Sequence, residues 1–226
     1  MNTIIDNTSV HSRSPAELWR TSTILKRTLD LTVSLPIVIA FAPIFAILII
    51  TVSLDGGPAF YAQKRVGRRG RIFHCWKFRT MVVDADEKLE ELLATDERVR
   101  QEYSSFWKLK DDPRVTGVGR FLRRYSLDEL PQILNVIKGD MSIVGPRPRS
   151  IKEMELYESK MPEFARDYGM VRPGLTCLWQ IKGRNRLSVE TKIWLDAHYA
   201  RNWSLHSDIA IIFATIPVVI KGEGAY

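Results

Sequence analysis

Cysteine is scarce in this 226-residue chain, and histidine is scarce as well. Cys75 and Cys177 stand far apart and have neither the spacing of a zinc site nor that of a disulfide framework. The four histidines show no ligand pattern either. We therefore expect two reduced thiols in a cytosolic setting and no zinc site.

Charge is missing from two neighbouring stretches. No charged residue occurs from Leu31 to Leu54, and no acidic one occurs between Asp55 and Asp84. As a helix, the first stretch is long enough to cross a bilayer core of about 30 Å. It starts too late and runs too long for a cleavable signal peptide.

The ends of the apolar run predict how it meets a membrane. Lys26 and Arg27 precede it, and the basic loop 63–71 follows it. Basic residues favour the cytoplasmic side, so a spanning helix would leave one cluster outside. A helix broken near Pro43, entering and leaving on one face, keeps both clusters inside. This pattern favours a re-entrant hairpin, with a span as the alternative. The basic loop also fits a patch that contacts anionic lipid headgroups without a catalytic role.

The net charge of +7 indicates an anionic partner. Nucleic acid, acidic lipid and a phosphorylated small molecule all meet that description. The apolar run and the absence of a clustered basic recognition helix count against nucleic acid.

Several local patterns predict secondary structure. Short apolar and aromatic runs around a Gly-Arg-Arg-Gly turn are typical of a β-hairpin, and periodic apolar positions predict helices. Ser188 is an expected N-cap. The predicted elements are a hairpin at 59–62 and 71–78, an acidic solvated helix at 82–107, helices at 150–168 and 188–201, and a short apolar helix at 209–220.

The stretch Arg123–Gly145 organises the rest. It places two adjacent carboxylates, Asp128 and Glu129, between basic residues and a Gly-Pro-Arg-Pro segment. One carboxylate can attack phosphorus as a nucleophile, and another can hold a hard divalent metal. Arginines can clamp phosphate oxygens. The same residues also fit a capping box in which Ser126 and Glu129 close a helix start. Residue chemistry alone leaves both interpretations open.

A second segment, Val171–Asn185, has an arginine near each end, Arg172 and Arg184. Such a loop could hold a nucleotide diphosphate. It could equally be an ordinary surface loop whose Trp179 belongs to the core.

The chain resembles the bacterial sugar transferases, the monotopic polyprenyl-phosphate phosphoglycosyl transferases, from about Lys26 to the C-terminus. It looks most like their exopolysaccharide-initiating, ExoY-type galactosyl transferases. The motifs that carry the resemblance are Lys26-Arg27…Asp30, Pro43, Gln63-Lys-Arg-Val-Gly67, Lys77-Phe-Arg-Thr-Met81, Asp112-Pro-Arg-Val-Thr116, Ser126-Leu-Asp-Glu-Leu-Pro-Gln132, Asn135-Val-Ile-Lys-Gly-Asp-Met141, Val144-Gly-Pro-Arg-Pro148, Val171-Arg-Pro-Gly174, Gly183-Arg-Asn185 and Asp196…Tyr199.

The resemblance implies transfer of a hexose-1-phosphate from a UDP-sugar to undecaprenyl phosphate, with release of UMP. Galactose is the first expectation for the hexose and glucose the second. Asp128 would be the nucleophile that forms a covalent phospho-sugar intermediate, and Glu129 would bind Mg²⁺. The substrate-binding set implied by the matched motifs is Arg147, Arg184, Arg172, Arg114, Lys77 and Arg79. Asp196 and Tyr199 are site candidates through the resemblance alone.

The family's re-entrant helix kinks at a Ser-Pro pair, which here is Ala42-Pro43. The proline is present and the serine is absent, so a kink held by a serine hydroxyl is not expected. The membrane contacts implied by the resemblance involve Pro43, Lys26 and Arg27.

The predicted fold class is a mostly helical α+β protein with three parts. Residues 1–22 would be a disordered tail, 23–56 a re-entrant membrane helix, and 57–226 a cytosolic catalytic domain with a short β-hairpin and surface amphipathic helices. We expect it at the cytoplasmic face of the inner membrane, with lipid contacts and without nucleic acid. A homodimer stays open. The alternative function is a non-enzymatic, membrane-anchored module that binds polyanions.

Overall fold

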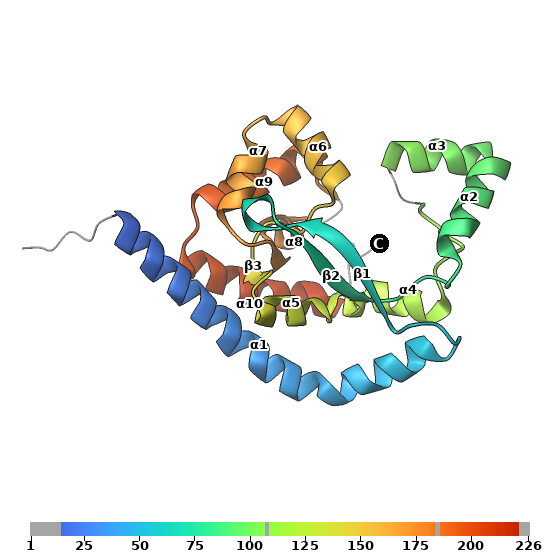
Figure 1. Ribbon diagram of the computed structural model, residues 1–226, viewed down its shortest axis with the longest axis horizontal. Coiled ribbons are helices and arrows are strands. Elements are labelled where there is room, and N and C mark those ends of the chain that lie inside the picture. The colour runs from blue at the N-terminus through green and yellow to red at the C-terminus, as the bar shows by residue number, and fades with distance from the viewer. Residues whose placement is uncertain (1–14, 107–108, 184–185, 222–226) are drawn as a thin grey trace, which may run out of the picture.

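The computed structural model describes residues 15–106, 109–183 and 186–221, and Figure 1 shows how they are arranged. Helices predominate, and the strands form two small sheets of two strands each. In chain order, the elements are α1 (Pro15–Ser53), β1 (Phe60–Val66), η1 (Arg68–Gly70), β2 (Ile72–Phe78), α2 (Ala85–Thr95), α3 (Glu97–Phe106), α4 (Gly117–Arg124), η2 (Leu127–Glu129), α5 (Gln132–Lys138), β3 (Ser142–Val144), α6 (Ile151–Lys160), α7 (Phe164–Met170), β4 (Gly174–Thr176), α8 (Leu178–Lys182), α9 (Val189–Arg201) and α10 (Leu205–Lys221).

The apolar run forms one continuous helix, α1, which passes through both Pro36 and Pro43. The break expected near Pro43 is therefore absent, and Figure 1 shows a curved helix instead. A proline inside a helix removes one hydrogen bond and bends the axis without having to end the helix. The helix begins at Pro15, within the segment 1–22 that was expected to be a disordered tail. Proline is favoured at the first position of a helix.

Both ends of α1 pack against the rest of the molecule. Its earlier part contacts α5, β3 and α10, and a contact with α4 adds to these. Within the described residues, Thr23–Ser53 is the one stretch long and apolar enough to cross a membrane, judged by length and composition. Most of its apolar surface is not covered by the protein itself, because only 11% of the most apolar window is buried.

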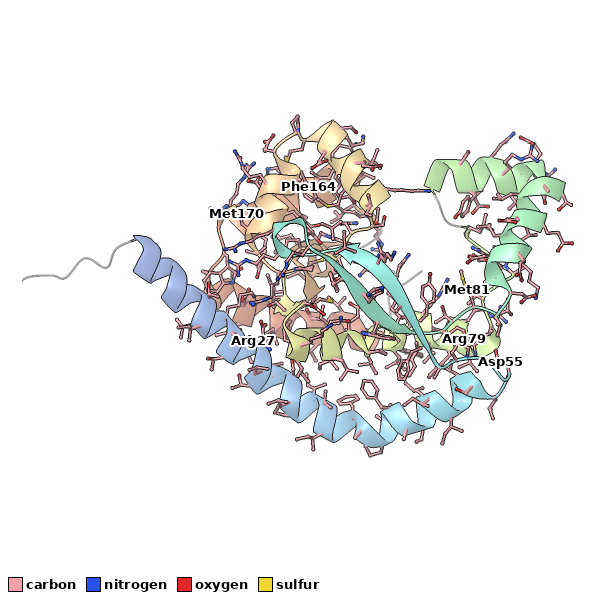
Figure 2. All side chains as sticks on the ribbon, in the orientation of Figure 1. Arg27, Asp55, Arg79, Met81, Phe164 and Met170 are labelled. Atoms are coloured by element: carbon pink, nitrogen blue, oxygen red, sulfur yellow. The ribbon has the colours of Figure 1, made fainter. Side chains whose placement is uncertain are left out.

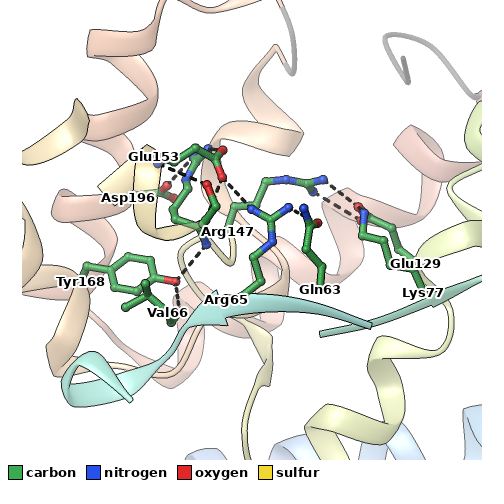
Figure 3. A network of polar contacts seen from close by, with 11 residues as sticks. Gln63, Arg65, Val66, Lys77, Glu129, Arg147, Glu153, Tyr168 and Asp196 are labelled. Atoms are coloured by element: carbon green, nitrogen blue, oxygen red, sulfur yellow. Dashed lines mark hydrogen bonds and ion pairs between the residues drawn. The ribbon is translucent and has the colours of Figure 1, made fainter. Parts of the chain in front are cut away.

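The expected β-hairpin is confirmed, and its first strand is longer than predicted. Strands β1 and β2 pair antiparallel from Phe60 opposite Phe78 to Val66 opposite Ile72. Alternate residues of a strand share a face. Gln63, Arg65 and Lys77 therefore lie on one side of the hairpin, as Figure 3 also shows.

The acidic segment forms two helices, α2 and α3, rather than one. Asp96 separates them, and its carboxylate accepts hydrogen bonds from the backbone N–H groups of Arg98 and Val99 at the start of α3. No residue of α2 is buried, as expected for a solvated helix.

The second sheet brings two distant segments into close contact. Strand β3 pairs in parallel with β4, with Ser142 opposite Gly174 and Val144 opposite Thr176. A Cβ atom on Gly145 would lie 2.3 Å from the Arg172 carbonyl oxygen, and one on Gly174 would lie 2.1 Å from the Gly145 nitrogen. Glycine is needed at both positions because the backbones approach so closely.

The C-terminal helices cover the remaining sides. The segment predicted as one helix over 150–168 is two, α6 and α7, and a capping box of Ser150 and Glu153 starts α6. The prediction of a helix capped by Ser188 is confirmed, because the Ser188 hydroxyl accepts from the Thr191 N–H at 3.2 Å in front of α9. Helix α10 buries Ile211 and leaves Phe213 exposed.

The main apolar core lies between the hairpin, α5, β3 and the last two helices. This position fixes the hairpin relative to the segment that carries the two acids. Its buried members are Phe73, Cys75, Val136, Met141, Ile143, Val144, Tyr199 and Ile211.

Candidate active site

The two adjacent acids lie on the short helix η2, and the capping interpretation of this segment is wrong. Ser126 adopts a left-handed conformation with φ of 56°, and its side chain makes no capping hydrogen bond. Helix α5 begins only at Gln132, directly after Pro131. The Glu129 carboxylate faces the hairpin and the loop after β3.

Two cations hold Glu129. The Lys77 ammonium on β2 contacts Glu129 Oε1 at 2.8 Å. Arg147, in the loop after β3, donates from Nη2 to the same oxygen at 2.7 Å and from Nη1 to Oε2 at 3.4 Å. Figure 3 shows these side chains converging from three elements. Segments far apart in the sequence therefore meet at one carboxylate.

Asp128 lies beside this cluster but is less tightly paired. Its Oδ2 is 3.8 Å from the Lys77 ammonium, and its side chain is 13% exposed. Burial raises the pKa of the Asp128 carboxyl, Lys77 opposes the rise, and the neighbouring Glu129 charge adds to it. A carboxylate with a raised pKa and one longer cation contact is a stronger nucleophile than one held directly by two cations.

The environment of Glu129 shifts its pKa in the opposite direction. Burial favours the neutral acid, but Arg147 and Lys77 together outweigh that effect and hold the pKa of Glu129 below its usual range. The charge of Glu129 raises the pKa of the Arg147 guanidinium in turn. The surroundings thus favour the ionised form of Glu129, whereas they raise the pKa of Asp128.

A second buried polar cluster continues from this site. Arg65 donates to Glu153 at 2.6 Å and to Gln63, on the same face of the hairpin as Lys77 (Figure 3). Arg149 contacts Asp196 at 3.1 Å. Burial raises the pKa of Asp196 to about 6, and Arg149 lowers it in part.

Aromatic rings surround the same arginines. The Arg149 guanidinium lies 4.6 Å from the Tyr157 ring centre and 5.5 Å from that of Trp179, and Arg147 lies 5.9 Å from Trp179. Ring faces attract cations, so these rings hold the arginines in place. Trp179 is buried, as the core interpretation expected, and it also borders the site.

Sequence reasoning missed Arg65, Arg149 and Glu153. Two signals were available. Arg149 directly follows the Gly-Pro-Arg-Pro segment, and Ser150 with Glu153 has the spacing of a capping box. Gln63 and Arg65 belong to a matched motif, but their place near Arg147 depends on the hairpin register.

Of the six predicted substrate-binding residues, Lys77 and Arg147 lie together at the two acids. Arg79 and Arg114 are engaged elsewhere. Arg79 pairs with Asp55 just after α1 and also donates to the Val52, Pro58 and Met81 carbonyls (Figure 2). Arg114 pairs with Asp112 at 2.6 Å and contacts the Ala85 carbonyl. Because these partners use their donors, both arginines fix the fold around the hairpin and α2.

The other two residues of that set lie in the second arginine-bearing segment. Arg172 donates from Nε to the Gly139 carbonyl at 2.8 Å, at the end of α5. Arg184 lies outside the described residues. Tyr199, a candidate by resemblance, donates to Asp208 at 2.6 Å and accepts from Lys26 at 3.2 Å.

The predicted membrane residues Lys26 and Arg27 face the protein. Lys26 is buried, with its ammonium 2.6 Å from Asp208. Arg27 donates to the Val136 and Ile137 carbonyls at the end of α5. A helix end exposes unpaired carbonyls that attract cations. These two residues, which the resemblance implied to be membrane contacts, attach α1 to the domain.

The donor set at the acids fits a hard divalent cation in part. Magnesium is commonly held by one or two carboxylates together with substrate phosphates, and Asp128 and Glu129 are adjacent. In the part of the chain that the structure describes, no three His, Cys, Asp or Glu side chains gather as a metal cage. Glu129 would have to exchange Lys77 or Arg147 for the ion, and those cations would then be free to bind phosphate.

Comparison with known proteins places the chain in a family. Residues 21–222 match the sequence model of the bacterial sugar transferases, and the chain belongs to that family. The resemblance drawn from the motifs is confirmed.

Individual relatives bear names that specify reactions. The chain is 49% identical over 207 residues to an undecaprenyl-phosphate galactose phosphotransferase of Salmonella typhimurium, covering 92% of this chain and 43% of the relative. It is 47% identical over 204 residues to the exopolysaccharide production protein ExoY of Sinorhizobium fredii, covering 90% and 88%. It is 38% identical over 208 residues to a UDP-glucose:undecaprenyl-phosphate glucose-1-phosphate transferase of Caulobacter vibrioides, covering 89% and 72%.

The chain thus spans less than half the length of the Salmonella relative and most of the length of ExoY. Similarity to the longer relatives covers the part that contains the two acids, the hairpin and the apolar helix.

Proposed function

We propose that this protein transfers a hexose-1-phosphate from a UDP-hexose to undecaprenyl phosphate through a covalent intermediate on Asp128. The observation that carries the proposal is that the two adjacent acids of η2 have different cation contacts. Glu129 is held by direct contacts with Lys77 and Arg147, while Asp128 has only the longer contact to Lys77, at 3.8 Å. The reactions named for the relatives support the substrate class.

In the first step, an Asp128 carboxylate oxygen attacks the β-phosphorus of the UDP-hexose. The bond from that phosphorus to the bridging oxygen breaks, and UMP leaves with the electron pair. Lys77 and Arg147 stabilise the charge that develops on the phosphate oxygens. The product of this step is an aspartyl phospho-hexose.

In the second step, a phosphate oxygen of undecaprenyl phosphate attacks the same phosphorus. The Asp128–phosphorus bond breaks, which regenerates the carboxylate and yields undecaprenyl diphospho-hexose. Two steps suit an enzyme at a membrane surface, because UMP departs to the aqueous side before the lipid phosphate approaches.

We assign Glu129, together with the substrate phosphates, to binding Mg²⁺. The chemistry that the ion supplies when bound is neutralisation of charge on the departing phosphate. We expect Glu129→Gln to abolish activity or to raise the Mg²⁺ concentration needed. An unchanged Mg²⁺ dependence in this variant would remove Glu129 as a ligand.

We also propose that α1 enters and leaves the membrane on one face, at the cytoplasmic side of the inner membrane. What supports this is that both of its ends contact the same domain. Lys26, which precedes the apolar run of α1, pairs with Asp208 of α10, and Arg79 pairs with Asp55, just past the end of α1. A straight span would place these contacts on opposite sides of the bilayer. Tags at the two termini should both be accessible from the cytoplasm, and a periplasmic N-terminal tag would contradict re-entry.

The decisive experiment measures UMP release and intact protein mass together. Wild type, Asp128→Asn and the exposed control Asp111→Asn are incubated with Mg²⁺ and a panel of UDP-sugars, with and without undecaprenyl phosphate. Without acceptor, wild type and Asp111→Asn should gain the mass of one hexose phosphate, and Asp128→Asn should not. The sugar that supports release identifies the substrate, with galactose expected first and glucose second.

Two outcomes of that experiment would change the conclusion. UMP release without a covalent adduct would support the transfer reaction but contradict an intermediate on Asp128. No release from any UDP-sugar by folded wild type would favour the membrane-anchored polyanion-binding module.

A further inference from the structure

The turn that closes the hairpin gathers positive charge without acidic partners. Arg68 and Arg69 lie in η1, which packs against α7, and Arg71 follows them. Arg172 comes two residues after the end of α7. In the described part of the chain, none of these four arginines forms an ion pair with an acid. Arg68 and Arg172 are half-buried, whereas the half-buried or buried Arg65, Arg79, Arg114, Arg147 and Arg149 each have an acidic partner.

Arg68 is the least favourably placed of these arginines. Its Nε is buried and has no hydrogen-bond partner. Burial lowers the pKa of the Arg68 guanidinium, and the like charges of Arg172 and Arg69 lower it further. Leaving a buried donor unsatisfied destabilises the folded state. An anion between these side chains would both satisfy the donor and relieve the repulsion.

The backbone under the arginines is strained and firmly held. Arg69 has a left-handed φ of 57°, which is unfavourable for a residue other than glycine. The Tyr168 hydroxyl donates to the Val66 carbonyl at 2.7 Å, and the Val66 N–H donates to the Arg149 carbonyl at 2.8 Å. Figure 1 shows the turn lying against α7. A fixed turn presents its guanidinium groups at little further entropic cost when a ligand binds.

This cluster is separate from the two acids. Arg172 donates to Gly139, at the C-terminal end of α5, whereas Glu129 lies just before the N-terminal end of the same helix. A helix of this length spans about 10 Å. A ligand held at the turn therefore does not occupy the position of the phosphate that Lys77 and Arg147 would bind.

We propose that Arg68, Arg69 and Arg172 form a second anion site that binds a phosphate group. Guanidinium forks match the geometry of phosphate oxygens. The phosphate could belong to the headgroup of an anionic phospholipid or be free in solution, and the chemistry of recognition is the same for both. The site goes beyond the proposed transfer reaction, since it needs neither Asp128 nor a sugar nucleotide.

The test measures the melting temperature of the full chain in neutral detergent during three titrations. The ligands are short-chain phosphatidylglycerol, short-chain phosphatidylcholine and inorganic phosphate. Binding to the folded state raises Tm. Arg68→Gln is compared with Arg98→Gln, which removes the same charge from an exposed position on α3. Repeating both in an Arg147→Gln background removes the contribution of the catalytic phosphate position.

Phosphatidylglycerol or inorganic phosphate should stabilise wild type and Arg98→Gln, with affinity about fivefold weaker in Arg68→Gln, since one basic residue contributes about 1 kcal/mol to binding an anionic surface. Stabilisation by phosphatidylglycerol alone identifies a lipid headgroup, and stabilisation by inorganic phosphate identifies a free ion. Equal affinities in Arg68→Gln and Arg98→Gln, or equal effects of phosphatidylcholine and phosphatidylglycerol, would overturn the site.

Two further readouts keep the test decisive. Without ligand, Arg68→Gln should melt no lower than wild type, because it removes an unsatisfied buried charge. If Arg68→Gln does not fold, the exposed Arg69→Gln replaces it, with the same expected loss of affinity. UMP release is measured in parallel, so that failure of the transfer reaction and failure of the anion site are seen separately.

Discussion

At the scale of single residues, the two adjacent acids differ because their neighbours differ. Glu129 receives direct hydrogen bonds from Lys77 and Arg147, which keep it ionised despite burial. Asp128 is desolvated by the same surroundings but lies 3.8 Å from Lys77, so burial dominates and its pKa rises. Two identical functional groups on consecutive residues thereby acquire different chemical roles.

This difference predicts the pH dependence of the reaction. Asp128 attacks as a carboxylate, so kcat/KM should fall as the pH drops through its raised pKa. Lys77 lowers that pKa, and Lys77→Gln should move the acidic limb of the profile to higher pH. The same substitution should reduce kcat/KM roughly tenfold or more, because a hydrogen bond to a charged group contributes about 1.5–3 kcal/mol.

The matched control for this measurement is Lys64→Gln, on the exposed part of β1. Its pH–rate profile should follow that of wild type. An acidic limb that stays in place in Lys77→Gln would show that Asp128 is not the titrating group.

At the scale of secondary-structure elements, α5 holds the hairpin in register with η2. The Asn135 side chain accepts from the Trp76 N–H at 3.0 Å and donates to the His74 carbonyl at 2.8 Å. The Asn135 side chain therefore satisfies backbone groups on the open edge of β2, as a neighbouring strand would. This connection places Lys77, the residue after Trp76, against Glu129.

Asn135→Ala should destabilise the protein and disturb the site. The Trp76 N–H and the His74 carbonyl would lose a buried partner, at a cost of about 2 kcal/mol. For a chain of this size, Tm should fall by about 4–8 °C, and kcat should fall with it. Asn202→Ala, which removes an exposed side chain after α9, is the control and should change Tm little. Equal Tm values for the two variants would contradict the role of Asn135.

At the scale of the whole molecule, α1 is fixed to the domain by buried polar contacts. Lys26 pairs with Asp208 of α10 and donates to the Val144 carbonyl, and Asp30 accepts from Ser142 and the Ile143 N–H. The helix is therefore positioned with respect to β3, the strand that leads into Gly145 and Arg147. The apolar helix and the candidate site are therefore linked through this junction.

Lys26→Met should destabilise the protein by about 3–5 kcal/mol, because it leaves the buried Asp208 carboxylate unpaired. Adding Asp208→Asn removes that charge and keeps hydrogen bonding to Tyr199 and Trp203, so the double variant should regain much of the loss. Lys160→Met, at the exposed pair with Glu190, should cost less than about 1 kcal/mol. Denaturant unfolding in detergent measures all three. A double variant as unstable as Lys26→Met would show that the pair does not act as a unit.

The amino-acid sequence by itself determined the local features of this protein. The apolar run, the hairpin, the helix cap at Ser188 and the family motifs follow from periodicity, turn residues and short-range spacing, which depend on neighbouring residues only. The sequence also predicted that Asp128 and Glu129 lie near basic residues, because arginines flank them in the chain.

Only the tertiary structure decided which basic residues meet the acids. The sequence does not distinguish between the basic residues of the matched motifs, which include Lys77, Arg79, Arg114, Arg147 and Arg172. Contacts between distant segments assign two of them to the acids, two to structural ion pairs and one to the end of α5. The same contacts turned Lys26 and Arg27 inward and excluded a capping role for Ser126. Long-range packing decides which partner a charged side chain has, because that partner comes from a segment that is distant in sequence and close only in the folded chain.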